Sequence, residues 1–314
     1  MDWKIEATPQ IGFFQRDHLM NLGEWRLALA YPALARLPLS LAWRSAARIG
    51  RWSGHERRNA LIAVSAGLEK AFPGIGADAG RLRVWTRDYL DMFSREAMDV
   101  FCMPRLNREN VGEYIHLRGI HHLEEARRHG RGVILVLNHY SRVIMILVRL
   151  GLMGVRMSML TMRIDEKNPD LSPFMRAFLR TKVERLLGFM GGRCLTLGEN
   201  LRPIYEGLRR GEIWIILSDA YMPQFGSWRE FPFLGGILQL PGGIERIAAR
   251  TGAHLVYGVT HESGPDRLDC ELRPLPPDPA EGLAAAVREL EKDVLASPGQ
   301  WWQWNILDFI WRPA

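Results

Sequence analysis

Only three cysteines, Cys102, Cys194 and Cys270, occur in the 314 residues of the sequence. They lie far apart and form neither a CxxC pair nor another metal-ligand spacing, so the pattern excludes a disulfide scaffold. Isolated thiols of this kind are most often buried in a core. The sequence therefore predicts a reducing, cytoplasmic setting, and we expect neither a metal nor another cofactor.

The sequence also lacks a long apolar run. We expect no secretory signal at the N-terminus. The uncharged runs within residues 24–52 cover only Leu27–Ala35 and Leu37–Trp43, whereas a spanning helix needs about 20 apolar residues. Arginines interspersed with Leu, Ala and Trp instead suit an amphipathic helix in a membrane interface, bent or broken at Pro32 and Pro38. The alternative is an ordinary core helix with a basic outer face.

Basic residues outnumber acidic ones, 41 Lys and Arg against 35 Asp and Glu, which gives a net charge of +6. This balance suits an anionic membrane surface or an acidic protein partner. The arginines are spread among apolar segments and form no recognition motif, so we expect no nucleic-acid partner. A hydrophobic content of 47% excludes a disordered chain, and the 11 Trp predict many rings that are buried or lie at an apolar boundary.

Helical periodicity dominates the first part of the chain. Apolar residues recur at three- and four-residue intervals over Glu56–Phe72, which ends at Pro73, and over Ala79–Phe101. We expect residues 1–110 to form a helical extension. It would pack on an α/β domain at residues 111–314 as one compact unit, because no flexible linker or repeat separates them.

Short apolar runs alternate with helical patterns after residue 130. Four runs are typical of buried strands: Val133–Leu137, Ile213–Leu217, Leu255–Val259 and Leu268–Leu272. The predicted helices are residues 142–153, Pro173–Leu187, Glu199–Arg210, Gly243–Thr251 and Ala280–Leu295. This alternation predicts an α/β fold in which helices cover both faces of a sheet.

Polar residues follow two of the predicted strands directly. Asn138-His139-Tyr140-Ser141 follows the first, and Ser218-Asp219 follows the second. The carboxyl ends of strands are where open α/β sheets usually carry their chemistry. We expect Ser141 to cap the next helix, which would place a neutral His139 at the helix N-terminus as a candidate general base. The alternative is a histidine with a purely structural role.

Several blocks of the sequence resemble one known family. GRGVILVLNHYSRVI, residues 130–144, is similar to the first motif of the glycerolipid acyltransferase superfamily, specifically its lipid A late-acyltransferase branch. MRIDEKNP (162–169) resembles the second block, residues 208–256 resemble the third and fourth, and WQWNILDFIWRP (302–313) resembles the closing segment. The resemblance covers nearly the whole chain in order, and it implies a mixed sheet covered by helices.

The resemblance implies a mechanism in which His139 deprotonates an acceptor hydroxyl. The hydroxyl then attacks an acyl thioester on acyl carrier protein or coenzyme A. Arg163, Phe233 and Gly235 fall on family positions and are predicted to bind substrate. Ser141 and Arg142 beside the histidine are further candidates: Arg142 would hold a substrate carboxylate or phosphate or point to solvent, and Ser141 as a covalent nucleophile is weaker than Ser141 as a cap.

One departure concerns the acid of the motif, which follows the family histidine by five residues. That position is Ile144 here, which gives an atypical HX4D/E motif. We predict that Asp219 supplies the acid, although it could instead bond the backbone of residues 220–226. Asp165 is the second choice. Two alternatives to a relocated acid are chemistry that needs none, such as acylation of an amine, and a protein that has lost catalysis.

A second departure concerns the acceptor. Basic residues of the family's closing segment are replaced by Leu307, Asp308 and Ile310. Cations there would suit phosphate groups, so their replacement argues against a phosphorylated lipid A precursor, unless it is drift at a surface helix end. We expect an acyltransferase on the inner face of the cytoplasmic membrane with another lipid-like or small-molecule acceptor. The alternatives are a specialised-metabolism enzyme that condenses or hydrolyses a carrier-bound acyl group, and a non-catalytic protein that binds acyl carrier protein or lipid.

Overall fold

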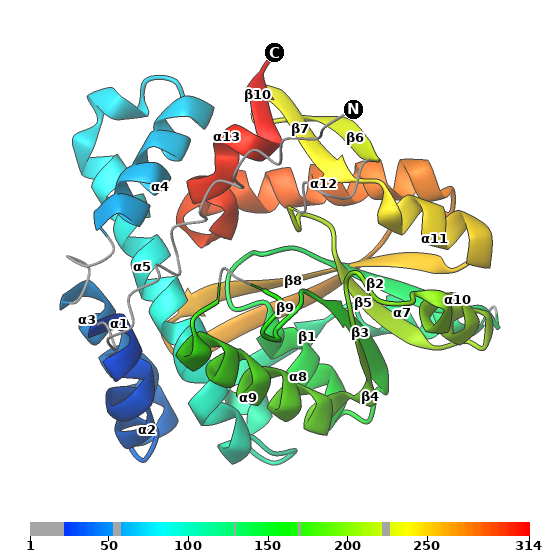
Figure 1. Ribbon diagram of the computed structural model, residues 1–314, viewed down its shortest axis with the longest axis horizontal. Helices are drawn as coiled ribbons and strands as arrows, with labels where there is room; N and C mark the ends of the chain where they lie inside the picture. The colour runs from blue at the N-terminus through cyan, green and yellow to red at the C-terminus, as the bar shows by residue number, and fades with distance from the viewer. Residues whose placement is uncertain (1–21, 53–57, 129, 169–170, 222–226) are drawn as a thin grey trace.

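A seven-stranded mixed sheet forms the centre of the protein, in the order β1-β9-β8-β2-β5-β3-β4. Figure 1 shows the computed structural model, which describes residues 22–52, 58–128, 130–168, 171–221 and 227–314. The strands are β1 (Ile115–Arg118), β2 (Val133–Leu137), β3 (Met157–Thr161), β4 (Gly191–Thr196), β5 (Ile213–Leu217), β8 (His254–Gly264) and β9 (Arg267–Pro274). Only the β8–β9 pair is antiparallel within this sheet. The predicted α/β fold with a mixed sheet is confirmed.

The central strand β2 faces two cores. Val133, Leu135 and Leu137 belong to the core shared with the helices α8 and α9, whereas Ile134 and Val136 belong to the core under α11 and α12. This alternation follows from the period of two in a strand, and burial on both faces explains why the run is continuously apolar. Figure 1 shows α8 and α9 below the sheet and α12 above it.

Helices cover both faces, as the sequence predicted. Those of eight residues or more are α3 (Leu39–Trp52), α4 (Arg58–Ala71), α5 (Ala79–Cys102), α7 (Ile120–Arg128), α8 (Ile144–Leu152), α9 (Pro173–Met190), α10 (Arg202–Arg209), α11 (Gly243–Thr251) and α12 (Pro279–Ala296). Shorter helices are α1 (Leu22–Trp25), α2 (Tyr31–Leu34), α6 (Val111–Tyr114) and α13 (Leu307–Ile310).

The helix after β2 begins later than predicted. α8 starts at Ile144, and its N-cap position is Val143, which makes no side-chain capping bond. Ser141 has a positive φ of 51° and is fully buried, and its hydroxyl has no hydrogen-bond partner among the described residues. The prediction that Ser141 caps this helix is therefore wrong: an N-cap residue has an extended φ, and the chain needs further residues to turn from β2 into α8.

The helical extension packs against the sheet domain through α3 and α5. The apolar face of α3, which includes Ala42, Trp43 and Ala46, is buried. Its exposed side carries Arg44 and Arg48. Of the two interpretations of residues 24–52, this part matches the core helix with a basic outer face, because the apolar face is already covered by protein. Within the described part of the chain, no helix is long and apolar enough to cross a bilayer.

A second, antiparallel sheet contains β6 (Trp228–Phe233), β7 (Gly236–Pro241) and β10 (Trp311–Pro313) in the order β10-β7-β6. The sequence did not predict it. Leu234 and Gly235 connect β6 to β7 with φ values of 50° and 69°. Two consecutive residues with positive φ between paired strands are the signature of a type I′ hairpin turn. Gly235 thus allows the turn.

Candidate functional site

His139 and Asp219 meet at the carboxyl ends of two neighbouring parallel strands. β2 pairs with β5 in a register that places Leu137 opposite Leu217, and the Ser218 amide donates to the Leu137 carbonyl at 2.9 Å. Each of the two site residues follows its strand by two positions, so the register brings them to the same height. The His139 Nδ1 atom lies 2.9 Å from Asp219 Oδ1.

The Asp219 carboxylate is enclosed by N–H donors. Its residue is fully buried. The backbone amide of His139 donates to both carboxylate oxygens, at 2.9 and 3.0 Å, and the indole Nε1 of Trp301 donates to Oδ2 at 3.0 Å. With the His139 ring, three N–H groups therefore converge on one carboxylate, an arrangement that stabilises its negative charge.

The contacts of His139 Nδ1 favour one tautomer. Nδ1 faces the acceptor-only carboxylate of Asp219, and the amide nitrogen of Gln303 lies 3.1 Å from the same atom. A lone pair on Nδ1 would repel the carboxylate, so Nδ1 carries the ring proton and its N–H donates a hydrogen bond to Asp219. The Gln303 amide donates instead to the Asp219 carbonyl, at 2.8 Å. Nε2 then holds the free lone pair, and the side chain is 27% exposed.

Ile144 occupies an apolar position in the core. It is the first residue of α8, is 6% exposed, and belongs to the cluster that also contains Leu135 and Leu137. A carboxylate there would lose its hydration inside an apolar cluster, which costs free energy. The acid beside His139 therefore comes from the end of β5 and not from α8.

Arg142 lies inside the protein. It is fully buried, its Nε donates to Asp99 at 2.8 Å, and its guanidinium lies 4.6 Å from the ring of Trp43. Burial raises the pKa of Asp99 to about 6, although the adjacent Arg142 lowers it. The structure corrects the prediction that Arg142 binds a substrate anion or points to solvent, because its charge is already paired within the core.

Arg163 and Asp165 form a pair at the same edge of the sheet, beyond the end of β3. Arg163 donates to Asp165 at 2.9 Å, and its side chain is 27% exposed. The side chain of Asp165 is 46% exposed. The described hydrogen bonds connect Asp165 with Arg163 and Lys167, so Asp219 is the carboxylate that the structure brings to His139. Substrate binding by Arg163 stays a prediction.

Phe233 is buried behind the site. It is 1% exposed, and its ring packs against Trp301 with the ring centroids 5.3 Å apart. Trp301 in turn bonds Asp219. Phe233 therefore supports a residue that contacts the His139–Asp219 pair, while Gly235 shapes the β6–β7 turn. Direct contact of either residue with a substrate stays a prediction.

The closing segment contributes residues that the sequence alone did not assign to the site. Trp301, Trp302 and Gln303 all contact His139 or Asp219. The only signal in the sequence was the similarity of this segment to the Trp-rich end of the family. Farther along, Leu307 and Ile310 are each 1% exposed, whereas the exposed Asp308 pairs with Lys70 of α4. The interpretation of these positions as drift at a surface helix end fails for the two apolar residues.

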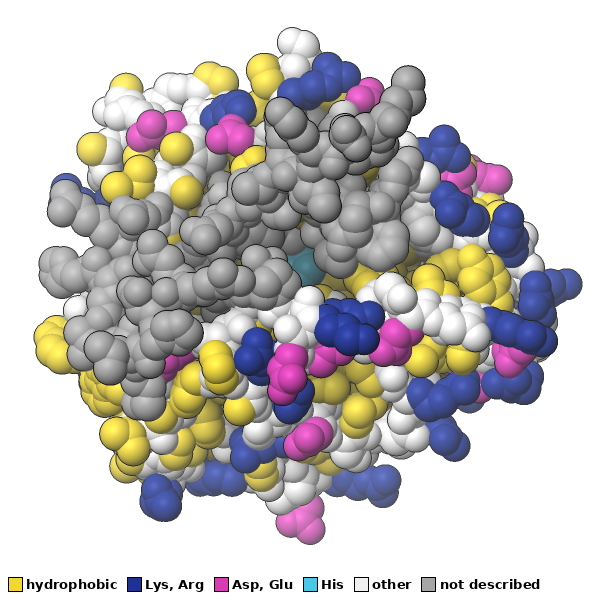
Figure 2. All heavy atoms as spheres, in the orientation of Figure 1, with side chains coloured by type: hydrophobic (Ala, Val, Ile, Leu, Met, Phe, Trp, Pro, Cys, Tyr) yellow, Lys and Arg dark blue, Asp and Glu magenta, His cyan; other side chains and the backbone are white. Residues whose placement is uncertain are grey.

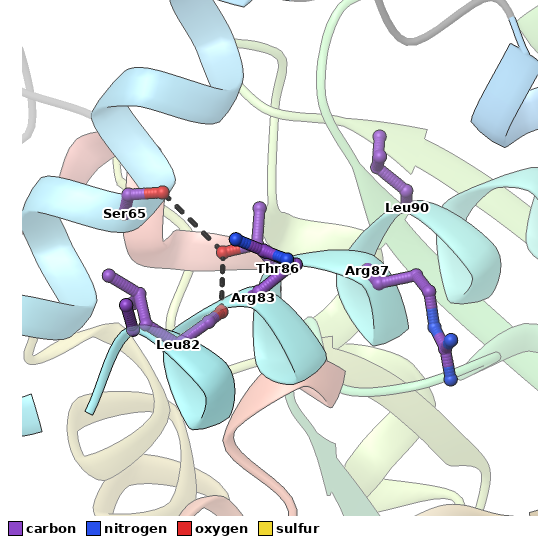
Figure 3. Close-up of a pocket in the computed structure, with 7 residues that line it drawn as sticks. Ser65, Leu82, Arg83, Thr86, Arg87 and Leu90 are labelled. Carbon is purple, nitrogen blue, oxygen red and sulfur yellow. Dashed lines mark hydrogen bonds between the residues drawn. The ribbon is translucent and has the colours of Figure 1, made fainter.

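Two other surface features lie apart from His139. A pocket of ≈ 350 Å³ is lined by residues of α4 and α5, with the Ser65 hydroxyl 3.4 Å from that of Thr86 (Figure 3). Figure 2 shows Lys and Arg side chains gathered over the part of the molecule that contains α10 and α11. There Arg210 pairs with Glu212 just before β5, at the opposite end of that strand from Asp219. Neither feature includes a predicted site residue.

The part of the chain that the structure describes contains no group of three or more His, Cys, Asp or Glu side chains that could hold a metal ion. Asp219 uses its oxygens for N–H donors, as described above. The three cysteines are free, and Cys102 and Cys270 are buried. Burial raises the pKa of each of these two thiols to about 12, so neither is a thiolate at neutral pH.

Comparison with known proteins finds one family. Residues 13–304 match the family described as bacterial lipid A biosynthesis acyltransferase. The chain is 21% identical over 316 residues to a protein of Haemophilus influenzae named lipid A biosynthesis acyltransferase, covering 95% of this chain and 92% of that protein. It is 23% identical over 235 residues to lipid A biosynthesis acyltransferase 2 of Shigella flexneri, covering 73% of this chain and 69% of that protein.

Proposed function

The chain belongs to the bacterial lipid A biosynthesis acyltransferase family, and we propose that it moves a fatty acyl group from a thioester to a hydroxyl or amine of a lipid-like acceptor. The donor is an acyl group on acyl carrier protein or coenzyme A. The observation that carries the proposal is the 2.9 Å contact between His139 Nδ1 and Asp219 Oδ1. It supports an oriented general base in a chain that lacks the motif acid.

His139 acts as the base through Nε2. As the acceptor oxygen or nitrogen attacks the thioester carbonyl carbon, its proton passes to Nε2, and the imidazolium that forms is stabilised by the Asp219 carboxylate. The tetrahedral intermediate then expels the thiolate, which takes the proton from Nε2. One ester or amide bond forms, one thioester bond breaks, and His139 returns to its starting tautomer.

We propose that the acceptor is not a phosphorylated lipid A precursor, because of the residues in the closing segment of the protein. Leu307 and Ile310 are buried there, and the exposed Asp308 carries a negative charge. These three side chains offer no cation to a phosphate group, and Asp308 already pairs with the nearby Lys70.

Attachment to the inner face of the membrane is proposed to use the outer side of α3. Arg44 and Arg48 are exposed on it, with Leu41 and Trp52 at 49% and 69% exposure. Exposed arginines beside Leu and Trp suit the surface of an anionic bilayer, and the net charge of +6 has the same sign.

Transfer of a radiolabelled acyl chain tests the proposal. Lauroyl, myristoyl and palmitoyl thioesters of acyl carrier protein and of coenzyme A are offered in separate reactions, with either a phosphorylated lipid A precursor or a total bacterial lipid extract as acceptor. His139→Ala should lower turnover at least about 100-fold. His121→Ala, which removes an exposed histidine of α7, is the matched control. Turnover that survives in His139→Ala contradicts the proposed base.

A further inference from the structure

We infer that Trp301 is a positioning residue that holds His139 in the tautomer needed for proton removal, an inference that rests on the proposed role of His139 as the base. Trp301 belongs to the segment Gln300–Gln303, here called the clamp. The clamp lies far from β2 and β5 in sequence, yet it contacts both residues of the His139–Asp219 pair. None of its side chains needs to touch the substrate to have this effect.

The clamp is joined to the loop after β2 like a short strand. Tyr140 and Trp301 form an isolated antiparallel bridge. The Ser141 amide donates to the Gln300 carbonyl at 2.7 Å, and the Trp302 amide donates to the His139 carbonyl at 2.9 Å. These main-chain bonds fix the position of the loop that carries His139, independently of any side chain of the clamp.

The indole of Trp302 adds a side-chain bond to the same loop. Its Nε1 donates to the Ser141 carbonyl at 2.8 Å, and its ring lies 5.4 Å from the His139 ring. Ser141 has a positive φ, which a residue other than glycine adopts only when its surroundings enforce it. The hydrogen bonds that Gln300 and Trp302 form with the backbone of Ser141 hold it in this conformation.

Trp301 fixes the carboxylate. Its side chain is fully buried, and its Nε1 donates to Asp219 Oδ2 at 3.0 Å. The bond holds the carboxylate with Oδ1 toward the His139 ring. Phe233 and Trp304 pack against the Trp301 ring at centroid distances of 5.3 and 4.9 Å, so the indole cannot turn to another partner.

The bond from Trp301 to Asp219 affects the tautomer of His139 because Gln303 offers a competing contact. Its amide nitrogen lies 3.1 Å from His139 Nδ1 and is a donor. If the carboxylate moved away from Nδ1, an unprotonated Nδ1 could accept a hydrogen bond from the Gln303 amide, and the single ring proton would then lie on Nε2. A ring protonated on Nε2 cannot take a proton from the acceptor. Trp301 therefore keeps Asp219, and not Gln303, as the partner of Nδ1.

The test is Trp301→Phe, which keeps an aromatic ring and removes the donor. Trp214→Phe is the matched control, because Trp214 is fully buried, its Nε1 donates to Glu212 at 3.2 Å, and it lies toward the opposite end of β5 from Asp219. We expect kcat for acyl transfer to fall about 10- to 100-fold in Trp301→Phe with KM unchanged, and to stay within about twofold in Trp214→Phe.

Nitrogen-15 NMR of labelled His139, at a pH where the ring is neutral, reads the tautomer directly. Trp301→Phe should raise the population protonated on Nε2, and adding Gln303→Met should restore the form protonated on Nδ1. An unchanged tautomer in Trp301→Phe overturns the inference. The NMR measurement needs no turnover, so a wild-type protein without acyl transfer would contradict the proposed function and leave the test of Trp301 valid.

Discussion

His139 Nδ1 contacts Asp219 Oδ1 at 2.9 Å although the two residues are 80 positions apart in the sequence. The contact arises because each residue follows one of two paired parallel strands. An acid at the motif position would lie at Ile144, at the start of the helix that follows the His139 loop. Here the carboxylate comes from the neighbouring strand, so the geometry of the pair depends on the sheet register.

Replacing Ile144 should affect stability rather than chemistry. Ile144→Val is expected to lower the free energy of unfolding by about 0.5–1.5 kcal/mol, and Ile144→Ala by about 2–5 kcal/mol, because the side chain is 6% exposed in the core. The kcat of the folded variants should stay within about twofold of the wild type. Urea denaturation followed by Trp fluorescence and an acyl-transfer assay measure the two quantities. A large loss of kcat without a loss of stability would give Ile144 a role that the structure does not indicate.

Replacing Asp99 alone should lower the free energy of unfolding much more than replacing both Asp99 and Arg142 with apolar residues. Asp99→Asn removes the carboxylate that the buried Arg142 bonds at 2.8 Å and leaves Glu262, 3.6 Å from Arg142 Nη1, to offset the charge in part, so we expect the free energy of unfolding to fall by up to about 3–5 kcal/mol. The double replacement Asp99→Leu with Arg142→Met should recover most of this loss. Chemical denaturation of the three proteins gives the values. A double variant no more stable than Asp99→Asn would show that the loss does not come from the charge left behind, contrary to the structure.

Reversing two charges on α3 should weaken membrane binding. Polybasic segments gain about 1 kcal/mol per basic residue at an anionic surface, so Arg44→Glu with Arg48→Glu is expected to lower binding to phosphatidylglycerol vesicles at least about 10-fold. Arg202→Glu on α10 with Arg210→Glu at the C-cap of that helix is the control, because these side chains are 79% and 57% exposed. Flotation at low salt measures the bound fraction. Equal binding by both double variants would exclude α3 as the contact surface.

The sequence predicted those parts of the fold that follow a strong local pattern. The bounds of β2 and β5 were predicted without error, and β8 and β9 were found but extend farther than predicted. β1, β3 and β4 were missed because their sequences, such as GGRCLT in β4, mix Gly and polar residues with few β-branched ones. Propensity alone does not identify such strands, which are defined by pairing with a neighbour.

The site was predictable in part for the same reason. Polar residues directly after two apolar strands predicted that His139 and Asp219 could meet, since parallel neighbours end at one edge. The bond from Trp301 to Asp219 joins residues 82 positions apart and follows no periodic pattern, so only the folded chain reveals it. The prediction of a Ser141 cap was wrong because the capping rule assumes an extended residue directly before the helix. Ser141 instead has a positive φ, in a loop that pairs with the clamp through Tyr140 and Trp301.

Asp219→Asn tests the central claim, that a strand-borne carboxylate orients His139 for acyl transfer. The variant keeps the size of the side chain and removes the charge that stabilises the imidazolium. Steady-state acyl transfer by wild type and variant, with circular dichroism to show that both are folded, is the direct measurement. A fall in kcat of about 100-fold or more is the predicted result. A folded Asp219→Asn protein with wild-type kcat would contradict it.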